Sequence, residues 1–338
     1  MTDPAPPGGD PAQAGSRNAP CWCGSGKRTK ACHGAIAADG RQVAALVADR
    51  RERTGGRQLI VCHAVNFLGN VLRAAASDKI LADVIGAEFA VALPWRCSDS
   101  VRAAAGMLLR DYPAPGWVPA LRVSETALMT FPGVYGTNSD PVREAVFMPA
   151  AALPSGDFGV AHIYAAVPHG MATAEYVRRK VAFHASLPVA PELMAAVDGF
   201  AARHDLGRTV GFHIRHTDNL QDPLKRNLQF NTPPETFAGK LEALVESGRR
   251  VLLCSDDPAI LDQMARRVPA GALVRADALS VPALQPLYEM LLLSRTEYVV
   301  GSYASTFSYE ACFFRGIDLE CFERGEWRRH PIATLAAG

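Results

Sequence analysis

Three cysteines and a histidine lie close together near the N-terminus of the chain. Cys21 and Cys23 are one residue apart, Cys32 and His33 are adjacent, and a Gly-Ser-Gly-Lys turn separates the two pairs. Thiolates and imidazole are common zinc ligands, and a structural zinc site holds four of them in a tetrahedron. Basic side chains in the turn would favour the thiolate form of the cysteines. The segment therefore predicts one structural zinc site with these four ligands.

Two other interpretations apply to a segment of this composition. A phosphate-binding loop needs a glycine five residues before Gly26 and a Ser or Thr after Lys27, but these positions hold Cys21 and Arg28. Unrelated surface cysteines beside a basic loop are the simpler alternative. The ligands and the turn together resemble the SEC-C motif, which also forms the zinc-binding tail of the preprotein-translocase ATPase. That resemblance implies an interaction or stability module rather than a catalytic one.

Polar side chains also follow three short apolar segments in the C-terminal half of the chain. They are His213, Arg215, Asp256, Asp257, Ser302, Ser305 and Thr306. In open α/β sheets, ligands bind beyond the carboxyl ends of the strands. Arginine suits a diphosphate, and hydroxyls beside a helix N-terminus suit an anion. The pattern predicts a phosphate site at one sheet edge, although the His-x-Arg strand end alone is equally typical of a structural ion pair.

Strands and helices alternate around these residues. The expected strands are 59–63, 87–93, 209–214, 250–254, 272–274, 298–300 and 318–322, with weaker candidates at 123–129 and 145–148. The expected helices are 36–53, 69–86, 172–186, 191–204, 234–247, 258–267, 282–294 and 306–314. Such alternation is typical of parallel sheets covered by helices on both faces. The expected fold is α/β, with two Rossmann-like domains facing a cleft.

Composition narrows the class of protein. The chain has 338 residues, of which 49% are hydrophobic and 20% charged, and a net charge of +1. These values are globular and give no field that favours nucleic acid or an anionic membrane. No apolar run is long enough to span a bilayer, and the acidic, Pro-rich start is not a signal peptide. We therefore expect a cytoplasmic protein without specific nucleic acid or a transmembrane segment.

The order of the strand-end residues resembles the inverting fucosyltransferases of the GT-B fold. That family includes the core α1,6-fucosyltransferases and the nodulation-factor fucosyltransferase, and the resemblance spans residues 58–325. It implies GDP-fucose or a related GDP-sugar as donor and a glycan-type acceptor. On this basis the chain divides into a disordered tail (1–17), the zinc knuckle (18–34), a helical linker (35–56), an acceptor-side domain (57–190) and a nucleotide-sugar-binding domain (191–330).

The resemblance also implies roles for the phosphate-side residues. Arg215 would grip the β-phosphate, and His213 would lie near the guanine or the ribose. The loop that contains Ser302, Ser305 and Thr306 would complete a phosphate cradle.

Further roles follow for residues on other elements. Asp256 and Asp257 would border the nucleotide pocket, and Glu289 occupies the position of a family acid that contacts the base. Asn70 lies in a segment similar to the family's Gly-x-Gly-Asn turn, which opens the first helix. Phe67 stands where the family has the first glycine of that turn. Asn70 is equally well explained as an ordinary first-turn residue.

An inverting transferase needs a general base for the acceptor hydroxyl and positive charge for the departing diphosphate. Asp218, Asp222 and Glu289 are all open as the base. The family's second arginine is His216 here, and a common lysine is Asn219. No Asp-x-Asp motif follows an expected strand, so we expect catalysis without a metal.

Two classes of function remain as alternatives. The first is a non-catalytic nucleotide-binding or scaffold protein, built on a degenerate transferase fold with a zinc module that binds a protein partner. The second is a dinucleotide-dependent oxidoreductase, which the sequence disfavours because no Gly-x-Gly-x-x-Gly joins a strand to a helix. The identity of the acceptor does not follow from the residues.

Overall fold

The structure is a computed structural model that describes residues 40–65, 67–93, 97–115, 118, 123–124, 128–131, 145–216, 232–303, 305–323 and 325–338. The expected tail and zinc knuckle lie outside the described residues. So do the predicted zinc ligands Cys21, Cys23, Cys32 and His33, and the candidate bases Asp218 and Asp222.

The N-terminal half is built on a parallel sheet with the order β2-β1-β6-β3. Its strands are β1 (Leu59–His63), β2 (Glu88–Ala92), β3 (Val123–Ser124) and β6 (Phe158–Val160). In the register, Ile60 lies opposite Phe89 on one side and Phe158 on the other. The first four residues of β1 are buried because both faces of the sheet are covered. A smaller sheet holds β4 (Met129–Thr130), β5 (Ala145–Phe147) and β7 (Ala166–Val167).

The C-terminal half contains a six-stranded sheet with the order β10-β9-β8-β11-β12-β13. The strands are β8 (Val210–Ile214), β9 (Val251–Ser255), β10 (Leu273–Arg275), β11 (Tyr298–Gly301), β12 (Asp318–Glu323) and β13 (Glu326–His330). All neighbours pair in parallel except β12 and β13, which form an antiparallel pair. β8 therefore lies between β9 and β11, and the carboxyl ends of these three strands meet at one edge.

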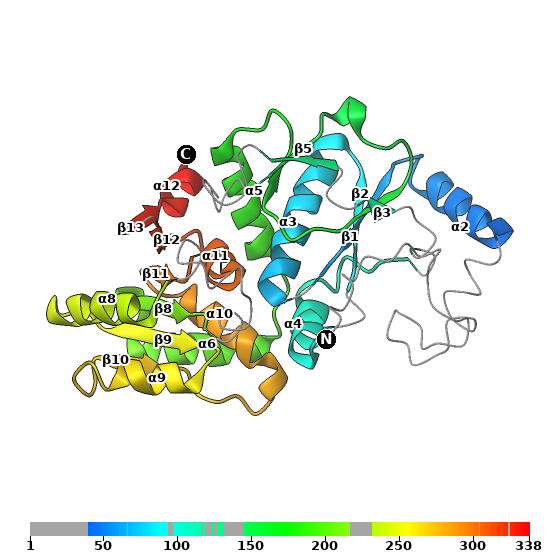
Figure 1. The fold of residues 1–338 in the computed structure, drawn as a ribbon. Coiled ribbons are helices and arrows are strands. Elements are labelled where there is room, and N and C mark those ends of the chain that lie inside the picture. Colours follow the sequence, from blue (N-terminus) through cyan, green and yellow to red (C-terminus); the bar gives the residue numbers. More distant parts are fainter. Residues whose placement is uncertain are drawn as a thin grey trace, which may run out of the picture.

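Helices pack around and between the two sheets (Figure 1). They are α2 (Gly40–Arg53), α3 (Leu68–Ile85), α4 (Asp99–Leu108), α5 (Thr173–Ser186), α6 (Pro191–His204), α8 (Pro234–Glu246), α9 (Pro258–Ala265), α10 (Gln285–Leu293), α11 (Thr306–Phe313) and α12 (Ile332–Ala337). Figure 1 draws α3, α5, α10 and α11 between the N-terminal and C-terminal sheets. None of the helices in the described ranges is long and apolar enough to cross a membrane.

One apolar core joins the two halves. It contains Val71 on α3, Tyr176 on α5, Leu252 on β9 and Val299 on β11, all of them buried. Since residues of both halves share this core, the orientation of the sheets is fixed by packing.

At the other end of the N-terminal half, the linker helix α2 is held in place by an ion-pair network. The side chain of Arg50 pairs with Glu88 at 3.0 Å and with Asp157, and both Arg50 and Asp157 are almost fully buried. This network fixes the segment that connects the N-terminal 39 residues to the sheet.

The α/β fold class expected from the sequence is confirmed, as are strands β1, β8, β9, β11 and β12. Expectation and structure differ in residues 96–170. Of the described residues in the expected strand 123–129, residues 123–124 belong to β3 and residue 129 to β4, whereas the sequence did not predict α4, β6 or β7. The strands among them have only two or three residues, too few to establish a period, whereas α4 does show a helical period in its buried residues Val101, Ala104, Ala105 and Leu108.

Candidate functional site

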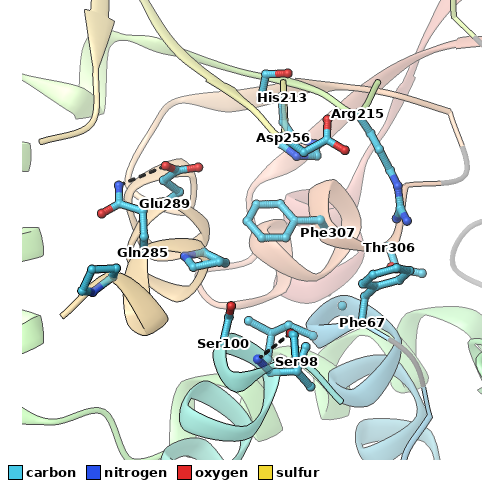
Figure 2. Close-up of a pocket in the computed structure, with 16 residues that line it drawn as sticks. Phe67, Ser98, Ser100, His213, Arg215, Asp256, Gln285, Glu289, Thr306 and Phe307 are labelled. Carbon is cyan, nitrogen blue, oxygen red and sulfur yellow. Dashed lines mark hydrogen bonds between the residues drawn. The ribbon is translucent and has the colours of Figure 1, made fainter. Parts of the chain in front are cut away.

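A cavity of about 480 Å³ lies between the two halves, within the size range of small-molecule sites. Its lining from the N-terminal half consists of Phe67, Leu68, Gly69, Ser98, Ser100 and Val101. Its lining from the C-terminal half consists of His213, Arg215, Ser255, Asp256, Pro282, Gln285, Pro286, Glu289, Thr306 and Phe307. The structure thus brings five predicted residues together around one cavity, namely His213, Arg215, Asp256, Glu289 and Thr306 (Figure 2).

At one end of the cavity, the N-termini of α3 and α11 meet. A Cβ added to Gly69 would lie 2.7 Å from the backbone nitrogen of Phe307 and 2.7 Å from Oγ1 of Thr306, so only glycine permits this approach. The N-cap residues, Phe67 for α3 and Ser305 for α11, form no side-chain capping hydrogen bond. Helix N-termini carry partial positive charge and amide hydrogens that suit an anion.

Two hydroxyl groups at the same end are buried without a partner. Among the described residues, Oγ of Ser305 and Oγ1 of Thr306 form no hydrogen bond, and these residues are only 1% and 6% exposed. A buried hydroxyl left unpaired is costly. Thr306 lines the cavity, so an acceptor from a ligand there, such as a phosphate oxygen, would satisfy its hydroxyl.

Arg215 adds a permanent positive charge to this end of the cavity. It follows β8 directly, and its backbone N–H donates to Oγ of Ser302 at 2.9 Å. Figure 2 shows its side chain extending toward Phe67 and Thr306, and its guanidinium carbon lies 5.0 Å from the centre of the Phe67 ring. We call the N-termini of α3 and α11 together with Ser305, Thr306 and Arg215 the anion end of the cavity.

His213 lies in the floor of the cavity as a neutral group. Burial lowers the pKa of its imidazole from 6.5 to about 4, with Asp256 acting against this shift and Arg215 adding to it. The ring stacks on Phe307 with centroids 4.6 Å apart, and its Nδ1 lies 2.8 Å from Oγ of Ser308. At neutral pH this imidazole therefore offers a fixed hydrogen-bonding nitrogen rather than a charge.

The opposite end of the cavity carries the carboxylate of Glu289. In Figure 2, Glu289 and Arg215 lie on opposite sides of Phe307. Burial raises the pKa of Glu289, and the amide of Gln285 opposes this shift by donating to Oε1 at 3.0 Å. Asp256 lines the cavity away from Glu289, beside His213 and Arg215 in Figure 2, and it accepts the backbone N–H of His216 at 2.7 Å. The end that carries Glu289, which we call the acceptor-rich end, suits a ligand group with N–H donors.

Four other predicted residues, Asp257, Ser302, Ser305 and Asn70, do not line the cavity, and Ser305 directly precedes Thr306, which does. Asp257 caps α9 by accepting the N–H of Ala259 at 2.9 Å, and it contacts Nδ1 of His216 at 2.6 Å. The hydrogen bond with His216 is the main cause of the lowered pKa of Asp257. Ser302 is buried behind Arg215, and Asn70 is buried in the first turn of α3. These residues lie next to the residues that line the cavity and contact the elements that carry them.

Several lining residues were not found from the sequence. Gln285 had a usable signal, because it lies four residues before Glu289 and so shares its face of α10. Ser98 also had one, since it is the N-cap of α4 and accepts the N–H of Val101. Phe307 had none, because its place beside His213 depends on the packing of α11 against β8.

Known proteins resemble this chain in two regions. The SEC-C motif matches residues 17–35. A crystal structure of the fucosyltransferase NodZ from Bradyrhizobium superposes with a TM-score of 0.51 at 15% identity, covering 81% of this chain and 99% of that one. A second NodZ structure gives 0.50 at 15% identity, covering 82% and 99%. NodZ soaked with GDP-fucose gives 0.48 at 15% identity, covering 81% and 99%. No curated protein sequence matches the chain.

These similarities define the class of protein at the level of the fold. The chain carries a SEC-C motif at its N-terminus, followed by an α/β structure of the GT-B type seen in fucosyltransferases. At 15% sequence identity, the structural similarity supports a shared fold only.

Proposed function

We propose that this protein is an inverting glycosyltransferase that takes its sugar from GDP-fucose or a related GDP-sugar. The observation that carries the proposal is the anion end of the cavity. There, two uncapped helix N-termini, the buried unpaired hydroxyl of Thr306 and Arg215 converge. A diphosphate supplies the negative charge and the acceptor oxygens that these groups require. The likeness of the fold to a fucosyltransferase agrees with this assignment.

The acceptor-rich end supports a guanine base. Guanine presents an exocyclic amino group, which is a donor, and Glu289 supplies an acceptor at this end of the cavity. The carboxylate of Glu289 would repel a phosphate, so a nucleoside diphosphate fits with its base here and its diphosphate at the anion end. His213 lies in the floor between the two ends, in reach of the base or the ribose.

In the proposed reaction, an acceptor hydroxyl attacks the anomeric carbon of the donor sugar. A bond forms between the acceptor oxygen and that carbon, the bond to the β-phosphate oxygen breaks, and GDP leaves with the electron pair. A general base takes the proton of the acceptor hydroxyl. Because Glu289 is assigned to the guanine, Asp218 and Asp222 are the proposed candidates for the base. Arg215 and the helix N-termini supply the positive charge for the leaving group, so the reaction requires no catalytic metal.

The N-terminal segment is proposed to bind one structural zinc ion. Cys21, Cys23, Cys32 and His33 form a Cys₃His donor set, which is a recognised structural zinc set, and the SEC-C motif spans all four. The described part of the chain has no cluster of three or more metal-binding side chains, so these residues are the proposed ligands. A cytoplasmic location, where thiols stay reduced, suits such a site. The proposed partner of the knuckle is another protein.

A second candidate, a non-catalytic GDP-binding protein, is favoured by one observation. His216 stands where the resembled family often has a second arginine, and its Nδ1 contacts Asp257 at 2.6 Å. A histidine engaged in this way does not provide the permanent charge that an arginine would give the leaving group.

Substitution of Arg215 tests both candidates. Loss of one preorganised donor to the leaving group typically lowers kcat about 10²–10³-fold, so we expect Arg215→Ala to lower the turnover of GDP-fucose by that factor. Arg215→Lys should be nearly as harmful, because it keeps the charge but loses the two-pronged geometry. Arg328→Ala is the matched control, since Arg328 forms an exposed ion pair with Glu326 on β13.

The outcomes separate the candidates. Turnover that Arg215→Ala leaves intact would show that the donor site is wrongly assigned. GDP binding that depends on Arg215, without turnover of any GDP-sugar, would favour the binding protein. Stabilisation by UDP equal to that by GDP would remove the guanine assignment.

A further inference from the structure

Phe67 is an exposed aromatic residue at the mouth of the cavity. Its side chain is 52% exposed, and among the large exposed apolar residues of the described ranges it alone lines the cavity. It directly precedes α3, whose N-terminus forms part of the anion end. The ring therefore lies beside the groups proposed to hold the diphosphate, although it can donate no hydrogen bond and carries no charge.

The ring of Phe67 contacts the cation of the anion end. The guanidinium carbon of Arg215 lies 5.0 Å from the ring centre, within the range of a cation–π interaction. An arginine side chain has many rotamers, and stacking on a flat ring restricts the orientation of its guanidinium plane. Figure 2 shows the ring next to Thr306, with Arg215 reaching down to it. The stack thus holds the guanidinium beside Thr306, whose hydroxyl is unpaired.

The position of Phe67 in the chain has a second effect. Phe67 is the N-cap residue of α3, with φ −90° and ψ 164°, and this position is usually taken by Ser, Thr, Asp or Asn. Any of those side chains would bond to an amide hydrogen of the first turn. An aspartate would in addition pair with Arg215. A phenylalanine does neither, so the helix N-terminus remains uncapped.

We propose that Phe67 is a positioning residue that prepares the anion end for a diphosphate. It acts through Arg215, whose guanidinium it orients by stacking, and through α3, whose N-terminus it leaves without a cap. The inference rests on the proposed function, because it takes GDP as the ligand of the anion end. It concerns a position where this chain differs from the glycine of the resembled family.

A double-mutant cycle on GDP binding tests the stacking. Phe67→Leu keeps the apolar character of the side chain but loses the aromatic face, and we expect GDP to bind about two- to fivefold more weakly. In an Arg215→Ala background, the same change should have no effect, because the cation is gone. Phe67→Tyr should bind GDP as the wild type does. Val84→Ala, which alters an exposed residue at the far end of α3, is the matched control.

Phe67→Asp gives an independent test, because a residue with a purely structural role would not change stability and GDP binding in opposite directions. Aspartate caps helices well, so this variant should melt at a higher temperature than the wild type. It should nevertheless bind GDP at least tenfold more weakly, since the carboxylate occupies the amide hydrogens and pairs with Arg215. Stability and binding then move in opposite directions.

Other outcomes overturn the inference. An equal effect of Phe67→Leu with and without Arg215 would remove the stacking role, and unchanged GDP binding in Phe67→Asp would remove the effect on the helix terminus. In both cases GDP would still bind the wild type, and the proposed function would stand. A wild-type protein that does not bind GDP would overturn the proposed function and this inference together.

Discussion

Glu310 is a fully buried carboxylate that joins three helices between the two halves of the molecule. Its Oε1 lies 2.7 Å from Nζ of Lys180 on α5 and 3.3 Å from Nε of Arg73 on α3. Nε2 of His184 lies 3.0 Å from Oε2, although these two atoms do not meet hydrogen-bond geometry. Arg73 lies just after the first turn of α3, and Glu310 lies just after the first turn of α11. The N-termini of these two helices form part of the anion end. The perturbation is Glu310→Gln, which keeps the shape and removes the charge.

The pKa of Glu310 sets the expected magnitude. Burial alone would raise this pKa, but Lys180, His184 and Arg73 outweigh it and lower the pKa from 4.5 to about 2. At about 1.4 kcal/mol per pH unit, this difference stabilises the folded state by about 3 kcal/mol. Removal of one partner from a buried ion pair typically costs about 3–5 kcal/mol, which agrees. We therefore expect Glu310→Gln to lower the free energy of unfolding by about 3 kcal/mol at pH 7.

The pH dependence provides a second signature. A lowered carboxyl pKa gives stability that is fully present above pH 4.5 and is lost as the pH falls toward 2. Between pH 7 and pH 3, Glu310 should account for about 2 kcal/mol of the loss in the wild type. Glu310→Gln should lack this part of the loss, so the stabilities of the two proteins should converge in acid.

Urea unfolding at pH 7 and pH 3 measures both effects. One transition is expected, because a single apolar core contains residues of both halves. Glu326→Gln is the control, since Glu326 pairs with Arg328 on the surface and its loss should change stability by no more than about 0.5 kcal/mol. Equal stability of Glu310→Gln and the wild type at pH 7, with parallel acid profiles, would refute the reasoning.

Three further predictions concern the cavity and the knuckle. Gly69→Ala should weaken GDP binding and lower the melting temperature, because the new Cβ would lie 2.7 Å from the backbone of Phe307. Gly199→Ala in α6, where no atom lies within 4 Å, should be neutral or slightly stabilising, and equal behaviour of the two variants would contradict this. GDP affinity measured by calorimetry should fall as the pH drops through the raised pKa of Glu289, and Glu289→Gln should remove this dependence. If the variant titrates like the wild type, another group is responsible. Metal analysis should find about one zinc per chain, and Cys32→Ser should abolish it without changing the circular dichroism of the α/β fold. Full zinc retention would exclude Cys32 as a ligand.

The sequence by itself determined the elements whose signals are local. The runs 210–214 and 251–255 were predictable as strands because a parallel strand buried on both faces is a continuous apolar run. Their end residues were predictable as neighbours because the carboxyl ends of parallel strands meet at one edge. The SEC-C motif was also predictable from local sequence, because its four ligand positions and its turn lie within one short segment.

The tertiary structure alone decided which distant residues meet. Arg73 and Glu310 are 237 residues apart, and no period within either helix indicates that they form a pair. The contact of Gly69 with Thr306 and the stacking of Arg215 on Phe67 likewise depend on how α3 packs against the C-terminal half. A local pattern specifies which face of a helix is apolar, but the partner of that face is chosen by shape and charge complementarity across the whole core. The residues of the anion end could therefore be named in part from the sequence, whereas their convergence followed only from the fold.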